Sequence, residues 1–180
     1  YSDGWDVSAR CGGRLWLMNK ELLAFDLNFD RNKLLKLWYK KYESKAKSWG
    51  KDYDIDTLKS RGGVTNIESF DGDRDAFKVS KVDHEEYPQI LMELFGIKAN
   101  ASIFFLKANA VLPYHVDTDL TCGINFILSD NPAPISFEKS GNTYEYKTAL
   151  LNLSLPHGVW NSSEDRILFK LSIVDEPYEV

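Results

Sequence analysis

The chain has 180 residues, of which 43% are hydrophobic and 13% aromatic. A chain of this length and composition can bury a substantial core, so we expect one domain over residues 1–180 rather than a disordered chain. The net charge of −5 gives no overall attraction for nucleic acid, and no apolar run approaches the length of a membrane-spanning helix. We therefore expect neither nucleic acid nor a membrane as a partner.

The two cysteines, Cys11 and Cys122, are too few for a disulfide framework or a thiolate metal site. We interpret them as buried or half-buried thiols. The start of the sequence also lacks an apolar signal segment. Together these features favour a reducing, cytoplasmic location.

The first part of the chain, about residues 1–99, has a mixed α/β pattern. Short strands are predicted at 14–18 and 22–28. Asp30 is a suitable N-cap for a helix over residues 31–48, in which apolar residues recur at helical spacing. The lysines of this segment fall mostly on its other faces, a pattern typical of a solvated surface.

The segment that follows this helix is polar. Residues 50–82 predict irregular loops with a single short strand. A second helix is predicted at 88–95, because Pro88 suits a first helical turn and Gly96 suits a helix end.

The remainder, about residues 100–175, has an all-β pattern. Turn residues separate eight predicted strands, at 102–107, 111–117, 122–128, 135–139, 143–147, 150–155, 158–161 and 167–174. Eight short strands in succession indicate a mainly β fold, a double-stranded β-helix of the jelly-roll or cupin-like type. The N-terminal helices are expected to pack on the outer face of one sheet, since the last strand is apolar at every odd position from Ile167 to Ile173.

Two histidines and one aspartate form a candidate metal site. His115 and Asp117 are two residues apart on one predicted strand, so their side chains point to the same face. His157 comes just before the seventh strand, which lies near the second strand in a jelly-roll. Two imidazoles and one carboxylate are a ligand set that suits non-haem Fe(II) and leaves coordination positions open. Asp119 would share the face of Asp117 if the strand continued, but the ligand pair needs only one intervening residue.

A basic residue opens the last strand. Arg166 alternates with the apolar odd positions and is therefore predicted to point into the barrel beside the metal. A buried guanidinium requires an anionic partner, and a bidentate carboxylate has the best geometry. That carboxylate belongs either to a protein acid or to a bound oxo-acid. Lys170, farther along the same face, competes with Arg166 for it.

The segments at 112–117 (Leu-Pro-Tyr-His-Val-Asp), 155–161 (Leu-Pro-His-Gly-Val-Trp-Asn) and 166–168 (Arg-Ile-Leu) resemble the Fe(II)/2-oxoglutarate-dependent oxygenases. The run from His157 to Arg166 is most similar to the aspartyl/asparaginyl β-hydroxylase-like branch. The resemblance covers residues 100–175. It implies that His115, Asp117 and His157 bind Fe(II) and that Arg166 binds the distal carboxylate of 2-oxoglutarate.

The resemblance also implies a reaction. Such an enzyme consumes O2 and 2-oxoglutarate, releases succinate and CO2, and hydroxylates a C–H bond. The substrate is an amino acid, a peptide or protein side chain, or a small metabolite. Further candidates for contacts with the cosubstrate are Asn125 on the third strand, Trp160 after His157, and Tyr114, which alternation places opposite His115.

Two alternatives use the same residues differently. A cupin-like metalloprotein with these ligands but without 2-oxoglutarate would not need a basic residue on the last strand, so Arg166 discriminates against it. A non-catalytic jelly-roll binding domain would use these side chains structurally and would not retain stoichiometric iron.

Overall fold

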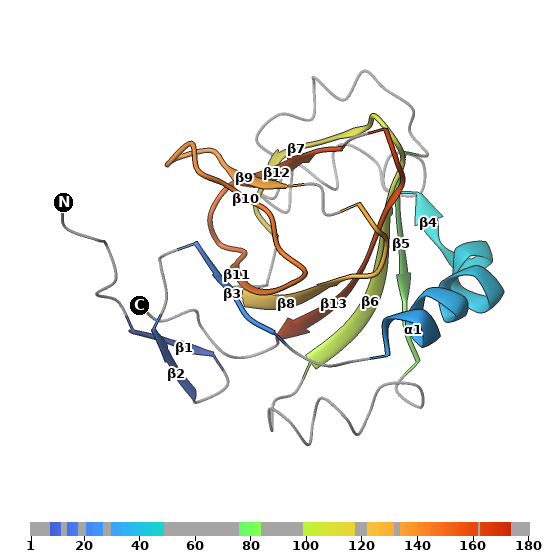
Figure 1. Cartoon of the computed structure of the whole chain (residues 1–180), viewed down its shortest axis with the longest axis horizontal. Helices are drawn as coiled ribbons and strands as arrows, with labels where there is room; N and C mark the ends of the chain where they lie inside the picture. The colour runs from blue at the N-terminus through green and yellow to red at the C-terminus, as the bar shows by residue number, and fades with distance from the viewer. Residues whose placement is uncertain are drawn as a thin grey trace.

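The computed structural model describes residues 8–11, 14–17, 21–26, 30–48, 76–83, 99–117, 122–131, 134–161 and 163–173, with side chains from residue 21 onward. Within these ranges the chain is mainly β (Figure 1). β1 (Ser8–Cys11) and β2 (Arg14–Leu17) pair as an antiparallel hairpin. The strand predicted at 14–18 is thus confirmed, whereas the helix predicted at 88–95 lies outside the described residues.

Two antiparallel sheets face each other in the rest of the described chain (Figure 1). The larger sheet has the order β3-β11-β8-β13-β6-β5-β4, and the smaller sheet has the order β10-β9-β12-β7. The strands of the larger sheet are β3 (Leu22–Ala24), β4 (Lys47–Ser48), β5 (Phe77–Lys81), β6 (Ala99–Leu106), β8 (Cys122–Ile127), β11 (Thr148–Asn152) and β13 (Arg166–Ile173). Those of the smaller sheet are β7 (Val111–His115), β9 (Ile135–Phe137), β10 (Thr143–Tyr144) and β12 (His157–Trp160).

The strands β6 to β13 correspond to the eight strands predicted from the sequence. In chain order, the first, third, sixth and eighth lie in the larger sheet, and the second, fourth, fifth and seventh lie in the smaller one. This distribution is that of a double-stranded β-helix, so the predicted jelly-roll fold is confirmed. Three earlier strands, β3, β4 and β5, extend the edges of the larger sheet. β3 lies within the strand predicted at 22–28, and β5 is the short strand predicted within 50–82, whereas β4 and the joining of these strands to the barrel sheet were not predicted.

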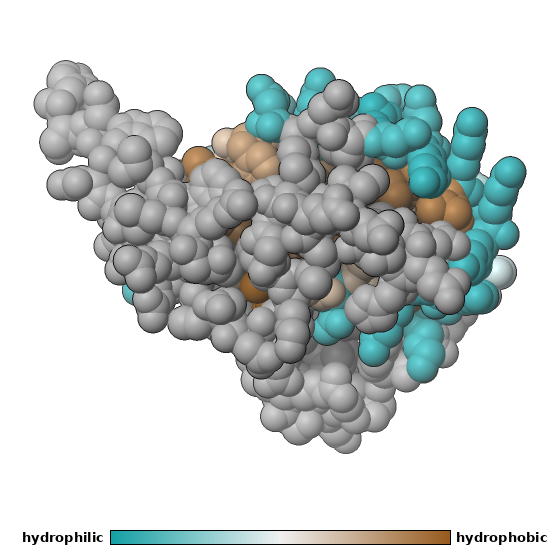
Figure 2. Space-filling model, turned by 90° about the horizontal axis from the view of Figure 1, so that it is seen from below, coloured by the Kyte–Doolittle hydropathy of each residue, from teal (hydrophilic) through white to brown (hydrophobic). Residues whose placement is uncertain are grey.

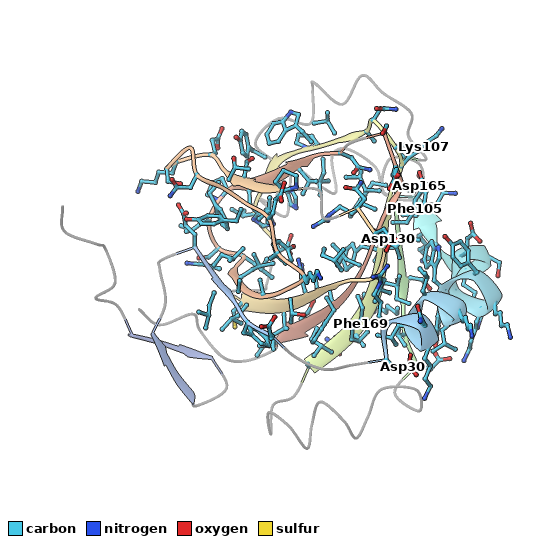
Figure 3. All side chains as sticks on the ribbon, in the orientation of Figure 1. Asp30, Phe105, Lys107, Asp130, Asp165 and Phe169 are labelled. Carbon is cyan, nitrogen blue, oxygen red and sulfur yellow. The ribbon has the colours of Figure 1, made fainter. Side chains whose placement is uncertain are left out.

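Hydrophobic side chains pack on both faces of the larger sheet. Ile167 and Phe169 of β13 belong to a cluster that also contains the buried rings of Trp38 and Tyr42. Figure 3 shows Phe169 on the side of the sheet where α1 lies. Leu168 belongs to a second cluster between the two sheets. The predicted alternation of β13 is therefore confirmed, and each large apolar side chain buried in this way contributes roughly 1.5–3 kcal/mol to folding.

The helix that covers the larger sheet is shorter than predicted. α1 (Arg31–Leu37) begins at the predicted N-cap, where the Asp30 carboxylate accepts a hydrogen bond from the Lys33 N–H. It continues as a π-helical turn, η1 (Trp38–Tyr42), and a 3-10 turn, η2 (Glu43–Lys45). The extension to residue 48 was wrong, because Lys47 and Ser48 pair with β5 at the sheet edge and thereby satisfy their backbone groups in a strand. No helix in the described part of the chain is both long and apolar enough to cross a membrane.

One cysteine differs from the expectation. Cys122, at the start of β8, is fully buried and disulfide-bonded rather than a thiol. The other cysteine of the sequence is Cys11, whose side chain lies outside the described residues. Disulfides are typical of oxidising compartments, so the cysteines do not favour a reducing, cytoplasmic location.

Candidate metal centre

Strand pairing brings the two distant histidines together. In the antiparallel β12–β7 pair, His157 lies directly opposite His115, and the register shifts just after His157. The two imidazole centroids are 4.5 Å apart. Gly158 permits this close approach, since a Cβ atom there would lie only 2.8 Å from the Leu112 carbonyl oxygen.

Asp117 lies two residues beyond the end of β7 rather than on it. Its backbone N–H donates to the Leu153 carbonyl at 3.2 Å, which holds the chain in place just after the strand. The side chain lies on the same side as His115, as expected for residues i and i+2 of extended chain. Asp117 Oδ1 lies 3.3 Å from Nε2 of His115 and 3.8 Å from Nε2 of His157.

The hydrogen bonds of both imidazoles orient their remaining nitrogens towards Asp117. Nδ1 of His115 lies 2.8 Å from the Pro113 carbonyl, and Nδ1 of His157 lies 2.8 Å from the Leu155 carbonyl. A carbonyl only accepts hydrogen bonds, so each Nδ1 carries a proton, and a neutral ring then presents the lone pair of Nε2. Metal-bound histidines commonly use this pattern, in which the second ring nitrogen donates to a backbone carbonyl.

Burial and nearby charges favour the protonation states that metal ligands require. Burial and the neighbouring His115 lower the pKa of His157 from 6.5 to about 4, although Asp117 opposes this shift. Burial alone would raise the pKa of Asp117, but the Lys170 ammonium and the adjacent histidines bring it well below its usual value. At neutral pH, His157 is thus neutral and Asp117 ionised, as metal binding demands.

The geometry of the group fits a single ion. One donor atom from each of His115, Asp117 and His157 can be chosen so that all lie within 4.8 Å of one another. Ligands about 2.1 Å from one metal are separated by roughly 3–4 Å, so the set needs little contraction to coordinate. Without a cation, neutral His157 and ionised Asp117 would aim lone pairs at each other, which is unfavourable. The donor chemistry therefore fits a metal.

Arg166 lies on the barrel side of β13 and is only 4% exposed. Its Nη2 donates to the Tyr146 hydroxyl at 3.1 Å, and Nδ2 of Asn125 donates to the same hydroxyl at 3.0 Å. Among the described residues, Arg166 Nε and Asn125 Oδ1 are buried without a hydrogen-bond partner. Sequence reasoning missed Tyr146, because it lies in the connection between β10 and β11 and only tertiary packing brings its hydroxyl to Arg166.

Lys170 is 7% exposed and lies on the same face of β13 as Arg166, two pleats away. Its Nζ donates to Oδ2 of Asp117. The ammonium also lies 5.3 Å from the ring centroid of Phe104 on the neighbouring strand β6. Lys170, which the sequence indicated as a competitor of Arg166 for a carboxylate, thus pairs with the carboxylate of the cluster itself.

Two other predicted candidates do not join this group. Trp160 is 44% exposed, and its ring makes an edge-to-face contact with Tyr114 at a centroid distance of 4.8 Å. Alternation along β7 directs Tyr114 away from the face that carries His115. Their predicted contacts with a cosubstrate therefore stay a prediction.

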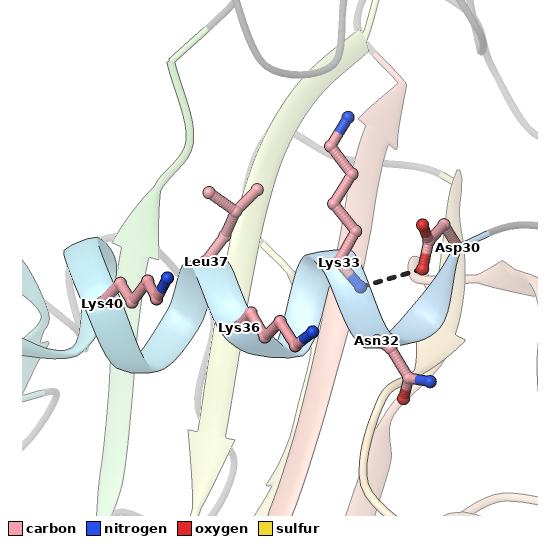
Figure 4. Close-up of a pocket in the computed structure, with 6 residues that line it drawn as sticks. All are labelled: Asp30, Asn32, Lys33, Lys36, Leu37 and Lys40. Atoms are coloured by element: carbon pink, nitrogen blue, oxygen red, sulfur yellow. Dashed lines mark hydrogen bonds between the residues drawn. The ribbon is translucent and has the colours of Figure 1, made fainter.

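A separate groove runs along α1 on the outside of the fold. Figure 4 shows the residues that line it: Asp30, Asn32, Lys33, Lys36, Leu37 and Lys40. Hydrophilic side chains project along this side of the molecule (Figure 2). The lysines are the solvated face that the sequence predicted, and none of the groove residues is buried. The groove therefore adds nothing to the candidate metal centre.

Fold and site together define a jelly-roll domain with a buried histidine–aspartate–histidine group and two interior cations. No protein-family model matches the chain, and no curated protein matches it. Solved structures with low similarity include the crystal structures of the DMSP lyases RdDddP and RnDddQII, at 9% identity over 56% of this chain and 49% of that chain, with a TM-score of 0.41. The present chain thus spans about half the length of that lyase chain.

Two further solved structures have comparable scores. The polyketide cyclase RemF from Streptomyces resistomycificus is 11% identical over 57% of this chain and 68% of its own, with a TM-score of 0.41. The viral collagen prolyl hydroxylase from Paramecium Bursaria Chlorella virus-1, solved as a 2OG complex, is 10% identical over 58% of this chain and 80% of its own, with a TM-score of 0.41. Such values establish neither a family nor an activity for this chain.

Proposed function

We propose that this protein is an Fe(II)- and 2-oxoglutarate-dependent oxygenase that hydroxylates a C–H bond. One observation carries the proposal: the barrel that encloses the cluster of His115, Asp117 and His157 also buries Arg166, which has no carboxylate partner among the described residues. The ligand set suits non-haem Fe(II), and a buried guanidinium suits the distal carboxylate of a dicarboxylic acid.

The charges inside the barrel support a dianionic ligand. Arg166 and Lys170 are both buried, whereas Asp117 is the only carboxylate among the described residues that pairs with either of them. A divalent ion at the cluster would increase this excess of positive charge. Because unpaired buried charge is costly, 2-oxoglutarate, a dianion, would offset what the protein leaves unbalanced.

Each residue of the site has a definite task in this proposal. His115, Asp117 and His157 would hold the ion, and Arg166 would anchor the end of 2-oxoglutarate that lies away from it. Fe(II) bound with 2-oxoglutarate and O2 supplies the oxidising chemistry, in which the substrate C–H becomes C–OH and succinate and CO2 are released. Arg166 and Lys170 are four residues apart on one strand, about 13 Å along the backbone, which leaves room for a cosubstrate between their long side chains.

The unpartnered Nε of Arg166 and the side-chain amide of Asn125 can both serve the same ligand. Arg166 Nε could donate to a carboxylate, since its hydrogen-bonding capacity is unused among the described residues. Turning the Asn125 amide by half a turn would let its oxygen accept from the Tyr146 hydroxyl and would free Nδ2 to donate to the ligand. The oxygen and nitrogen of such an amide are assigned by their surroundings, so both orientations are compatible with the fold.

Apolar side chains line the space between the two sheets and would limit the access of water to the site. Leu112, Phe137, Val159 and Leu168 are buried in the cluster between the two sheets. Exclusion of water strengthens the interaction of the site residues with charge and protects reactive species. In the wider proposal, the substrate is an amino acid, a peptide or protein side chain, or a small metabolite. The resemblance to the aspartyl/asparaginyl β-hydroxylase-like branch is the basis for the first two.

One observation favours a different class of protein. Lys170 already neutralises Asp117, and such a buried ion pair can serve structure alone. This favours a non-catalytic jelly-roll binding domain, in which the ammonium replaces a metal. Iron stoichiometry distinguishes the two, because that domain would retain none. A cupin-like metalloprotein would instead bind the metal but not 2-oxoglutarate.

The test is an anaerobic titration of the purified protein with Fe(II) and then 2-oxoglutarate. We expect a visible charge-transfer band to develop with 2-oxoglutarate, and succinate to form when O2 is admitted. His115→Ala and His157→Ala should abolish the band. Arg166→Ala should weaken 2-oxoglutarate binding by about 3 kcal/mol, roughly 150-fold, because it removes the charged partner of a buried carboxylate.

Arg31→Ala is the matched control, since Arg31 is a partly exposed arginine that pairs with Asp130 on the outer surface. It should leave the affinity for 2-oxoglutarate unchanged. An unchanged affinity in Arg166→Ala would refute the role of Arg166. Iron binding without any response to 2-oxoglutarate would favour the cupin-like alternative, and the absence of iron binding would favour the non-catalytic domain.

A further inference from the structure

The two oxygens of the Asp117 carboxylate have different neighbours. Oδ1 faces the Nε2 atoms of His115 and His157 at 3.3 and 3.8 Å. Oδ2 accepts a hydrogen bond from Lys170 Nζ. One oxygen is thus directed to the position of a metal, and the other is already engaged.

The surroundings of Lys170 hold its ammonium at this oxygen. On β13, Lys170 lies between Asn125 of β8 and Ser102 of β6, so the position of its backbone is set by pairing on both sides. A Cβ atom at Gly123 would lie 3.3 Å from Lys170 Cε, so the lack of a side chain there leaves space for the lysine stem. The ring of Phe104 lies 5.3 Å from Nζ. Its negative face favours the retained ammonium.

We propose that Lys170 is a positioning residue that reserves Oδ2 of Asp117, so that Asp117 offers a metal only one oxygen. A carboxylate with both oxygens free can bind an ion through both of them and occupy two positions. With Lys170 in place, a six-coordinate ion bound by this group would keep three positions for other ligands. The inference rests on the proposed function only in requiring a metal at the cluster; it does not require 2-oxoglutarate.

A positioning role and a simple structural role predict opposite effects of losing Lys170 on metal affinity. An ammonium near a divalent ion repels it, so loss of the charge should strengthen metal binding or leave it unchanged. Loss of a residue that merely supports the fold should weaken metal binding instead. The number of water molecules on the bound ion provides an independent readout, because a carboxylate that binds through both oxygens displaces one.

The experiment uses Mn(II) as the probe and measures the water-proton relaxivity of the bound ion together with its dissociation constant. Lys170→Met keeps an unbranched apolar stem as far as the ε carbon but removes the amine that donates. We expect its Mn(II) affinity to equal or exceed that of the wild type, and its relaxivity to fall by about one third, as one of three water positions is lost. Lys170→Gln, which keeps an N–H donor without the charge, should restore much of the relaxivity.

Lys78→Met is the matched control. Lys78 is also partly buried, and its ammonium lies 6.0 Å from the ring centroid of Phe105 on the helix-covered side of the sheet. This variant should retain the wild-type relaxivity and affinity. Circular dichroism would verify folding, and Lys170→Gln provides the test if Lys170→Met does not fold.

The outcomes separate the two proposals. Weaker Mn(II) binding with unchanged relaxivity in both Lys170 variants would overturn the positioning role and leave the proposed function intact. A relaxivity loss in Lys170→Met, in a protein that binds metal but ignores 2-oxoglutarate, would support the positioning role and refute the oxygenase. If the wild type binds no metal, both are refuted and Lys170 is part of a structural ion pair.

Discussion

The replacement Gly158→Ala tests whether the close approach of β12 to β7 holds the two histidines in place. The added methyl group would lie 2.8 Å from the Leu112 carbonyl oxygen and 3.2 Å from backbone atoms of Pro113 and Tyr114. All three contacts are with backbone, so no side chain can rotate away. To reach an ordinary contact distance, the strands would have to separate by about 0.6 Å.

Overpacking of this kind costs typically 1–3 kcal/mol, and we expect about 2–3 kcal/mol here because the strand itself must move. For a chain of this size that corresponds to a fall in Tm of roughly 5–10 °C. His157 precedes Gly158, so the same shift would move its imidazole away from His115. Since ligand geometry must be held within about 0.5 Å, we expect metal affinity to fall roughly 10- to 100-fold.

Thermal unfolding and Mn(II) titration measure the two effects. Gly141→Ala is the matched control, because Gly141 has a φ of +72° in an exposed turn with nothing near its missing Cβ. It should lower stability by about 1–2 kcal/mol through backbone strain and leave metal affinity unchanged. Wild-type stability and metal affinity in Gly158→Ala would show that β12 and β7 are not packed as described.

Three further changes probe other parts of the fold. Burial alone would raise the pKa of Glu21, but hydrogen bonds, including that from Tyr144, lower it below 4.5. The ionised carboxylate therefore stabilises the fold fully above pH 4.5, and this stabilisation is lost as pH falls through the lowered pKa. Melting curves from pH 7 to 3 should therefore show a smaller acid-induced loss for Glu21→Gln, and curves parallel to the wild type would contradict this. Tyr146→Phe removes the hydroxyl that accepts a hydrogen bond from Arg166 and holds its guanidinium in place, so calorimetric titration should show 2-oxoglutarate binding weakened about tenfold. An unchanged affinity would exclude the hydroxyl from the anchor. Trp38→Ala should lower the free energy of unfolding, measured with denaturant, by about 3–5 kcal/mol. Trp38→Phe should lower it by less than about 1.5 kcal/mol, since the indole N–H has no partner among the described residues. Equal costs would refute this, and metal affinity should not change in either variant.

The features predicted correctly from the sequence depend on short-range periodicity. The apolar odd positions from Ile167 to Ile173 indicated which face of β13 packs under the helix, and the same alternation directed Arg166 into the barrel. Asp30 was recognisable as an N-cap because capping involves only the next few residues. The eight-strand pattern then sufficed to predict which strands bring His115 and His157 together.

The features that were missed depend on contacts between distant segments. The helical pattern continues beyond Lys45, but pairing with β5 draws Lys47 and Ser48 into a strand, so tertiary structure overrides local preference. Tyr146 follows the end of β10, where no periodicity defines a direction for its hydroxyl. The bonding of Lys170 to Oδ2 of Asp117 likewise depends on the space left by Gly123 on another strand.

One face of β13 carries the charged residues of the barrel interior, and the other face carries part of the apolar core. The site and the stability of the fold therefore depend on the same strand register. A shift of this strand by one residue would turn Arg166 and Lys170 towards the apolar cluster under the helix and bring Phe169 into the barrel. An insertion or deletion inside β13 would therefore unfold the protein rather than yield a stable molecule with an altered site. Changes in ligand preference must accordingly come from substitutions at positions that face the barrel, or from the loops, and not from changes in the length of this strand.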